Sequence, residues 1–373
     1  MPDSVDCKLS VPVRLGPRSY TIRVLSGQTA AFGPFAREAL DATWGGRPCR
    51  RALVVTDQNV APLAEPFESA LAAGGIETVR AVLHPGEVAK SLQHAADLYD
   101  KLVKMRADRH TCVIALGGGV VGDLAGFVAA TYARGLPLLM VPTTLLAQVD
   151  SAVGGKVAVN HPRAKNIIGA FHQPIGVWID TETLDSLPAR ELRCGLAEVI
   201  KYGVILDADL FAFLEQNVSA ILALEPEAIC HIVARSCQLK ARVVEQDERE
   251  ETGLRAILNF GHTIGHALEA VAGYGDRFHH GEAVAIGMIA ECHLAERLGW
   301  IGAELTGRVQ ALVEAFGLPS TIPDLDRAEL FDAMTRDKKN ECGRIRFVLP
   351  RSMGCVELTD APATADVRSV LIP

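Results

Sequence analysis

The sequence predicts an α/β N-terminal domain followed by a mostly α-helical C-terminal domain. Short apolar runs at 51–57, 111–116 and 137–142 are typical of buried strands, and helix-length stretches separate them, as in a parallel sheet. From residue 188 onward, apolar residues recur with helical spacing. At 373 residues, the chain is about two and a half times a typical domain. We therefore expect two domains, 1–187 and 188–373, with the active site in the cleft between them.

The expected elements follow in chain order. Residues 8–25 alternate as β-like runs, and the strand at 51–57 ends in an acid, Asp57. Two further strands follow, at 111–116 and 137–142. The helical segments of the second domain are predicted at 189–203, 209–224, 228–246, 262–273, 282–299 and 307–316. A last β-like run, 344–350, follows a turn at Cys342–Gly343.

Composition excludes several classes of protein. Apolar residues make up 49% and charged residues 22%, which excludes a disordered, collagen-like or coiled-coil chain. A net charge of −8 argues against a non-specific nucleic-acid binder. We find no apolar run of transmembrane length and no signal peptide, and we expect a cytoplasmic protein that binds no membrane. Nine cysteines without a C-x-x-C pair are expected to be reduced and buried.

A glycine-rich loop follows the predicted strand at 111–116. Gly117, Gly119 and Gly122 fit the pattern G-x-G-x-x-G between a strand and an apolar helix, which favours a pyrophosphate at the helix N-terminus. A tight strand-to-helix turn without a ligand is the alternative. The usual acid about 20 residues further on is missing, and Asp57 is the better candidate for the ribose. The nucleotide-binding domain is therefore expected to be Rossmann-like but non-standard.

Five of the eleven histidines lie between residues 262 and 293. His262 and His266 stand four residues apart, on one face of a predicted helix, which is a spacing that metal-binding helices use. Glu198, followed one turn later by Lys201 in an apolar helix, is a candidate third ligand. For the histidines, the alternative is an ordinary position in the core or on the surface. For Glu198 and Lys201, the alternative is an i,i+3 pair on the surface of the helix.

A polar stretch at 142–174 holds Asp150, Lys156, Lys165 and Asn166 among glycines and other small residues. Small residues let a ligand approach the backbone, and isolated lysines suit phosphate and carboxylate groups. A solvated loop is the alternative.

These motifs together resemble the 3-dehydroquinate synthases, a family of sugar-phosphate cyclases. The resemblance rests on 117–135, 142–156, 165–174, 187–203, 254–269 and 280–288, with weaker matches at 56–59, 86–90 and 337–340. It implies conversion of 3-deoxy-D-arabino-heptulosonate 7-phosphate to 3-dehydroquinate and phosphate, in the shikimate pathway. The steps implied are transient oxidation by NAD, phosphate elimination, re-reduction and an intramolecular aldol closure, with Zn2+, or Co2+ in its place, polarising substrate oxygens.

The resemblance also implies roles for individual residues. The metal ligands are Glu198, His262 and His280, so that His266 becomes a proton-relay partner and not a ligand. The catalytic residues are Lys156, Asn166, Lys201 and Asn259, together with His266. The substrate contacts are Arg134, Asp150, Lys156, Asn166, Lys201, Lys240, Arg255, Asn259 and Lys338 (or its neighbour Lys339). The NAD contacts are Asp57, Asn59, Glu87, Lys90, Gly118, Gly119, Val120, Val121, Gly122, Asp123, Thr143, Thr144, Lys156, Lys165, Thr183, Leu184, Asp185 and Ser186.

Two further features concern assembly and local sequence. Arg134 matches an arginine that reaches the phosphate site of the neighbouring subunit, which implies a homodimer. After Lys156 the family usually has Thr-Gly, whereas this chain has Val157-Ala158.

Three other functions share some of these features. Related cyclases act on glucose 6-phosphate or sedoheptulose 7-phosphate, but they usually alter the second histidine or the lysine loop, and here His266 and Lys156 are both present. Arg255 and Lys240 suit a substrate carboxylate. Metal-dependent polyol dehydrogenases share the two-domain plan and release NADH. A catalytically dead binding protein is expected to have lost a ligand, and none is lost.

Overall fold

The computed structural model describes all residues except 1–6, 45–47, 274–276, 336–344 and 372–373. The expected substrate residue Lys338 and its neighbour Lys339 lie outside the described residues. The chain divides into two compact units. Unit 1 comprises Met1–Leu187 and Ile229–Arg249, and unit 2 comprises Pro188–Ala228 and Glu250–Pro373.

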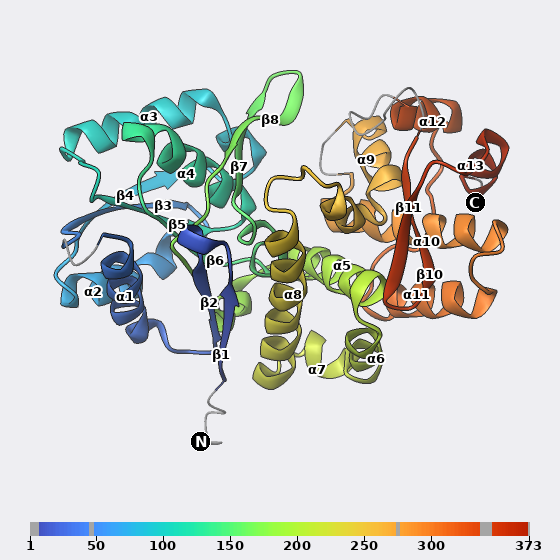
Figure 1. Cartoon of the computed structure of the whole chain (residues 1–373), viewed down its shortest axis with the longest axis horizontal. Helices are drawn as coiled ribbons and strands as arrows, with labels where there is room; N and C mark the ends of the chain where they lie inside the picture. The colour runs from blue at the N-terminus through green and yellow to red at the C-terminus, as the bar shows by residue number, and fades with distance from the viewer. Residues whose placement is uncertain (1–6, 45–47, 274–276, 336–344, 372–373) are drawn as a thin grey trace. The chain divides into compact units, whose positions relative to one another are not determined.

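Unit 1 is built on a seven-stranded sheet with the order β1-β2-β9-β6-β5-β3-β4 (Figure 1). Only β1 and β2 pair antiparallel, and the other neighbours are parallel. The expected runs at 51–57, 111–116 and 137–142 form β3, β5 and β6. The strands are β1 Lys8–Val13, β2 Tyr20–Leu25, β3 Arg51–Asp57, β4 Glu77–Leu83, β5 Cys112–Gly117, β6 Leu138–Pro142 and β9 Gly176–Asp180.

The central strands of this sheet are apolar throughout, so both faces of the sheet have to be covered. Every residue of β5 and of β6 is buried, as parallel strands between helical layers require. Phe32, Phe67 and Trp178 pack edge to face within the core on one side. The helices are α1 Phe32–Trp44, α2 Ala64–Ala73, α3 Leu92–Lys104 and α4 Gly119–Thr131, and a hairpin of β7 Lys156–His161 and β8 Ala164–Phe171 is added.

Unit 2 is mostly helical, as the spacing of its apolar residues predicts. Its helices are α5 Ala189–Leu206, α6 Ala208–Gln216, α7 Val218–Leu222, α9 His262–Val271, α10 His280–Arg297, α11 Ala303–Ala315, α12 Arg327–Thr335 and α13 Thr364–Val370. The expected β-like run at 344–350 becomes β10 Phe347–Ser352, which pairs with β11 Cys355–Thr359. Phe347 and Leu349 of this hairpin are buried among apolar residues of α9, α10 and α12.

The long helix α8, Pro226–Gln246, departs from the expected domain boundary. Sequence analysis assigns it to the second domain, whereas Ile229–Arg249 packs in unit 1. The Oε1 atom of Glu245 accepts a hydrogen bond from the N–H of Arg14, and Glu248 forms an ion pair with Arg18. Helical periodicity shows that a segment is a helix but not which core its apolar face joins.

One expectation about the cysteines is wrong. Cys7, just before β1, forms a disulfide with Cys230 of α8. The two residues are 223 positions apart, so only the packing of α8 in unit 1 brings them together. Cys49, Cys112, Cys194, Cys237 and Cys292 are free and buried, and Cys355 is free but exposed.

Among the described residues, none of the helices combines the length and the apolar character that crossing a membrane would require.

Candidate metal and nucleotide sites

The strand order of unit 1 favours a ligand site at the carboxyl ends of two neighbouring strands, β3 and β5. From β3 the chain passes to β4 on one side and then to β5 on the other, so the order reverses between β3 and β5. In open α/β sheets, ligands bind outside the carboxyl ends of the strands at such a point. Asp57 ends β3 and Gly117 ends β5. Asp57 and the glycine loop, both singled out from the sequence, therefore lie at the same end of two paired strands.

The glycine loop opens α4. Gly118 is the N-cap, and the helix runs from Gly119, so its first turn presents backbone N–H groups to an anion. Two side chains pack closely against the loop. A Cβ on Gly118 would lie 3.1 Å from the Thr144 methyl, and a Cβ on Gly119 would lie 3.2 Å from the Ser151 hydroxyl. Thr144, an expected NAD contact, thus packs against the loop.

A buried lysine links the loop to the β7–β8 hairpin. The ammonium group of Lys90 forms an ion pair with Asp123 of α4 and donates a hydrogen bond to the Oδ1 atom of Asn166. Burial raises the pKa of Asp123, and the positive charge of Lys90 opposes that shift. Nearby, Glu87 accepts a hydrogen bond from Asn160 of β7 at 3.0 Å. The N–H of Asn166 also donates a hydrogen bond to the Oδ1 atom of Asn160, so three expected NAD contacts and one expected substrate contact form one network.

A second lysine joins α8 to the segment after β6. The ammonium group of Lys240 donates hydrogen bonds of 2.6 Å to both the main-chain oxygen and the Oδ1 atom of Asp150. Asp150 lies in a π-helical turn, Ala147–Ser151, a type of turn frequent at functional sites. In the same turn, Gln148 donates a hydrogen bond to the hydroxyl of Thr183. The packing of α8 in unit 1 thus positions Lys240, an expected substrate contact that the predicted domain boundary assigns to the other domain.

Other expected contacts of unit 1 differ in exposure. Lys156 and Lys165 are exposed on the hairpin. Asp57 already accepts hydrogen bonds from the N–H groups of Asn59 and Val60, which fold the chain after β3 into a turn. Of the turn at 181–186, Thr183 and Leu184 are buried.

The Val157-Ala158 departure has a packing explanation. Val157 is buried in β7 against Gly126 of α4, where a Cβ on the glycine would lie 2.3 Å from a Val157 methyl. The two apolar residues continue the core of unit 1 beside Lys156. The lysine itself remains at the exposed start of the strand.

Unit 2 gathers a carboxylate and two imidazoles. Glu198 lies on α5, His262 begins α9 and His280 begins α10. The Oε1 atom of Glu198 is 3.6 Å from the Nε2 atom of His262 and 3.7 Å from that of His280. Glu198 is 1% exposed. Among the described residues it forms an ion pair with Lys201, but its oxygens accept no hydrogen bond.

These distances fit a divalent cation. Two ligands each about 2.1 Å from an ion, at a tetrahedral angle, stand about 3.4 Å apart. The three donor atoms lie within 4.8 Å of one another. One carboxylate and two imidazoles leave a fourth position open, as catalytic zinc sites do. An ion bound between the carboxylate and the two rings would satisfy the buried oxygens of Glu198, which accept no hydrogen bond among the described residues.

The far nitrogen of each imidazole has its own partner. The Nδ1 atom of His262 lies 3.0 Å from the main-chain oxygen of Phe260, and that of His280 lies 3.2 Å from the Oε2 atom of Glu269. Burial lowers the pKa of His280, but the hydrogen bond and negative charge of Glu269, with Glu198, outweigh it and raise the pKa above its ordinary value. Glu269 was not predicted from the sequence, although it stands two helical turns after His262 on the same face.

The position of His266 differs from that of the other two histidines. Its ring centroid lies 5.2 Å from that of His262 and 6.0 Å from that of His280. The structure groups it with Glu269 and His280, not with Glu198 and His262. The i,i+4 spacing therefore brings His266 beside the cluster but not onto the set of donors that faces Glu198.

Close helix packing holds this geometry. A Cβ on Gly281 would lie 2.3 Å from the main-chain oxygen of Cys194, and a Cβ on Gly287 would lie 2.0 Å from that of Gly261. Only glycine fits at these two contacts, the first between α10 and α5 and the second between α10 and the start of α9. The glycines of the motif at 280–288 thus bring the three ligand-bearing helices together.

Three further expected substrate residues of unit 2 lie a few residues from Glu198 or His262 in the sequence. Lys201 is buried beside Glu198. Arg255 is 3% exposed and lies, like Asn259, on the 3-10 turn Leu254–Asn259 that precedes α9.

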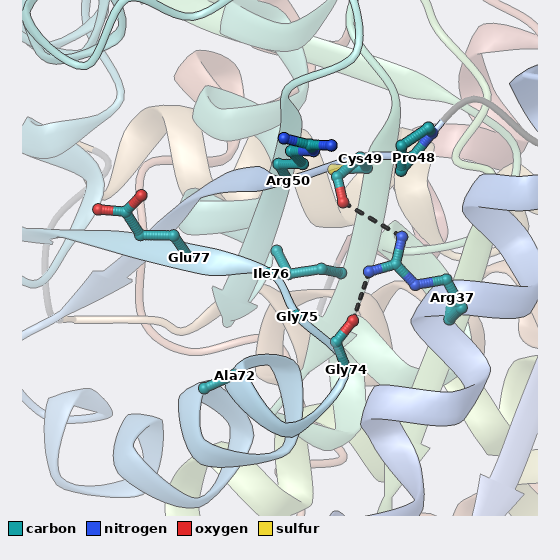
Figure 2. A pocket seen from close by; sticks show the side chains of 9 residues that line it. All are labelled: Arg37, Pro48, Cys49, Arg50, Ala72, Gly74, Gly75, Ile76 and Glu77. Atoms are coloured by element: carbon teal, nitrogen blue, oxygen red, sulfur yellow. Dashed lines mark hydrogen bonds between the residues drawn. The ribbon is translucent and has the colours of Figure 1, made fainter.

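A separate pocket of unit 1 is not a candidate for these functions. Figure 2 shows it at the amino ends of β3 and β4, lined by Cys49, Gly74 and Glu77. The guanidinium group of Arg37 donates to the main-chain oxygens of Cys49 and Gly74, so it ties α1 to these loops. The expected nucleotide residues lie at the opposite ends of the strands.

Known proteins resemble this chain over most of its length. The family models described as 3-dehydroquinate synthase N-terminal and C-terminal match residues 80–194 and 195–340. A 3-dehydroquinate synthase of Desulforamulus reducens is 50% identical over 97% of this chain and 99% of its own. That of Geobacter metallireducens is 48% identical over 96% of this chain and 98% of its own.

Solved structures share the fold. A 2-epi-5-epi-valiolone synthase of Streptomyces hygroscopicus, with NAD+ and Zn2+ bound, is 29% identical, with a TM-score of 0.84 over 94% of this chain and 95% of its own. A butanol dehydrogenase of Thermotoga maritima shares only the fold, at 17% identity and a TM-score of 0.63 over 94% of this chain and 95% of its own. From the two family models and the near-complete alignments to its relatives, the chain belongs to the 3-dehydroquinate synthase family.

Proposed function

We propose that the protein performs the reaction of its family with a divalent cation held by Glu198, His262 and His280 and with NAD at the carboxyl edge of the unit 1 sheet. The reaction converts 3-deoxy-D-arabino-heptulosonate 7-phosphate to 3-dehydroquinate and phosphate. One observation carries the assignment of the metal site: a carboxylate that is 1% exposed faces two Nε2 atoms at 3.6 and 3.7 Å.

Two lines of support bear on the cofactors. The valiolone synthase that is 29% identical to this chain has NAD+ and Zn2+ bound. The donor set of one carboxylate and two imidazoles suits zinc, and cobalt, which accepts the same ligands, is expected to replace it. When bound, the cation would polarise substrate oxygens, and NAD would accept a hydride and return it.

The side chains of the protein bind and orient the charged groups of the substrate. Lys201, Lys240 and Arg255 are buried cations, which favour a phosphate or a carboxylate over a neutral sugar. His266 carries an imidazole 5.2 Å from that of His262, a position that suits the transfer of a proton from a substrate oxygen. Asn166 and Asn259 supply uncharged hydrogen-bonding groups, and Lys156 offers an exposed ammonium group.

The proposal includes a homodimer in which Arg134 reaches the phosphate site of the partner subunit. Arg134 is exposed in the 3-10 turn Tyr132–Arg134 that follows α4, and its backbone and that of Ala133 are left-handed, with φ of 67° and 49°. Non-glycine residues held in this conformation concentrate at functional sites. The proposal also includes a cytoplasmic location, the one that the sequence favours.

The decisive experiment measures products. The purified protein is given the heptulosonate phosphate, NAD and zinc, and phosphate, 3-dehydroquinate and NADH are followed. We expect phosphate and 3-dehydroquinate in equal amounts with no net NADH. Net NADH would identify a polyol dehydrogenase instead. Phosphate release from glucose 6-phosphate or sedoheptulose 7-phosphate alone would identify another cyclase.

A further inference from the structure

Glu269 lies behind one of the proposed metal ligands. It is on α9, two turns after His262, and its side chain is 12% exposed. Its Oε2 atom lies 3.2 Å from the Nδ1 atom of His280, whose Nε2 atom faces Glu198. We propose that Glu269 is a positioning residue that holds the Nδ1 proton of His280 and thereby turns its Nε2 lone pair toward the cation. This inference rests on the proposed metal site.

The hydrogen bond fixes one of two tautomers. A neutral imidazole carries a proton on one nitrogen only, and the other nitrogen is the one that binds a metal. A carboxylate accepts hydrogen bonds and cannot donate them, so Glu269 requires the proton on Nδ1. Nε2 is then unprotonated, 3.7 Å from the Oε1 atom of Glu198. The ring is thus held in the form and orientation that coordination needs.

The two histidine ligands are supported unequally. His262 is backed by the main-chain oxygen of Phe260, a neutral group that no side-chain substitution removes. His280 is backed by a charged side chain, and it is the more exposed of the two imidazoles, with 33% of its side chain accessible against 11%. Less packing holds the ring of His280, so its orientation depends more on the carboxylate. A carboxylate also increases the basicity of the ligand it backs.

Direct coordination by Glu269 is the competing role. His266, Glu269 and His280 also bring donor atoms within 4.8 Å of one another. In that arrangement the Nδ1 atom of His280 would bind the ion and Glu269 would be a ligand. The contact of 3.2 Å between Oε2 and Nδ1 has the length of a hydrogen bond, which favours the positioning role.

The test is a titration of the metal-free protein with Co2+, followed by visible absorption and by competition with a chelator. We expect Glu269→Ala to weaken Co2+ binding about 10- to 100-fold. We expect Glu269→Gln to weaken it less, because the amide oxygen still accepts the Nδ1 proton. At saturation both variants should show the wild-type spectrum, since the ligands are unchanged.

The control is a carboxylate beside another histidine. Glu296 lies 3.7 Å from His293 on the exposed part of α10, and Glu296→Gln should bind Co2+ like the wild type. Thermal melting of the metal-free variants checks that each is folded. If Glu269→Ala does not fold, Glu269→Leu, which keeps the bulk of the side chain but has no hydrogen-bond acceptor, takes its place in the test.

Two results would overturn the proposal. If both Glu269 variants bind within about twofold of the wild type, the carboxylate does not position the ligand. If the saturated spectrum changes, Glu269 is itself a ligand. The variant His262→Ala distinguishes a failure of the Glu269 proposal from a failure of the proposed metal site. If His262→Ala also binds Co2+ normally, the ion lies elsewhere and the proposed metal site has failed as well.

Discussion

The Nε2 atom of His262 lies 3.6 Å from the Oε1 atom of Glu198, although the two residues belong to different helices, α9 and α5. A buried carboxylate without a hydrogen bond is costly unless a charged partner satisfies it. Lys201 supplies one such partner, and a cation between the carboxylate and the imidazoles would supply another. If the proposed site is correct, the binding of a metal should therefore stabilise unit 2.

Removing one ligand should separate metal binding from catalysis. We expect His262→Ala to lose its zinc, because two of three protein ligands cannot hold the ion as tightly. His266→Ala should retain zinc and lose activity by about 10²- to 10⁴-fold, the usual contribution of a proton-transfer group. Metal content by mass spectrometry and phosphate release measure the two effects. Loss of zinc from His266→Ala would show that the i,i+4 pair binds the metal after all.

Close packing at Gly287 should be sensitive to a single methyl group. A Cβ there would lie 2.0 Å from the main-chain oxygen of Gly261, so Gly287→Ala should destabilise the protein by about 1–3 kcal/mol and weaken metal binding. Gly307, within α11, has open space around its Cβ position, and Gly307→Ala should stabilise by about 0.5–1 kcal/mol. Denaturant unfolding compares the two variants. Equal stabilities would contradict the role of Gly287.

Arg134 tests the shared site. A charge-assisted contact of an arginine with phosphate contributes about 1.5–3 kcal/mol, or about 10- to 150-fold in substrate binding. Arg134→Ala should therefore raise KM strongly. We expect neither Arg134→Ala nor His262→Ala to show appreciable activity as a pure homodimer.

Mixed dimers of the two variants make the test specific. They place both lesions in one site and leave the other intact, so mixing should restore up to half of the wild-type activity per mixed dimer. Native mass spectrometry confirms that mixed dimers form. If they form without activity, Arg134 acts within its own subunit.

The cysteines should differ sharply in reactivity. Burial raises the pKa of the Cys194 thiol and of the Cys237 thiol to about 12, so both stay protonated and covered at mildly alkaline pH. Among the cysteines that the structure describes, Cys355 alone is free and exposed, and it should react with iodoacetamide first of these. Cys7 and Cys230 should be labelled only after reduction in denaturant. Peptide mapping reads each site, and labelling of Cys194 as fast as Cys355 would contradict the burial.

Stability in acid should depend on Glu248. Its hydrogen bond from Arg18 holds the pKa of this carboxyl below its ordinary value of 4.5. The contribution of the pair is therefore present above pH 4.5 and is lost as the pH falls through the lower, folded-state pKa. The difference in unfolding free energy between the wild type and Glu248→Gln should shrink over this range. If the difference does not change with pH, or persists in an Arg18→Gln background, the pair is not its cause.

Much of unit 1 could be predicted from the sequence, because its elements are encoded by local patterns. Apolar runs of strand length, the glycines after β5 and the acid that ends β3 each lie within a few residues of the feature they determine. The alternation of strands and helices implies a parallel sheet, and in such a sheet ligands bind at the carboxyl ends of the strands. The helices of unit 2 are likewise encoded by their periodicity.

The tertiary structure decided what depends on contacts between distant segments. The spacing of His262 and His266 shows that they share a helix face, but which nitrogen faces Glu198 depends on how closely α5, α9 and α10 pack. The disulfide of Cys7 with Cys230 and the position of Lys240 beside Asp150 both follow from the packing of α8 in unit 1. A helical pattern fixes the direction of an apolar face relative to its own axis, whereas the surface that the face covers is chosen by the burial of apolar area over the whole chain.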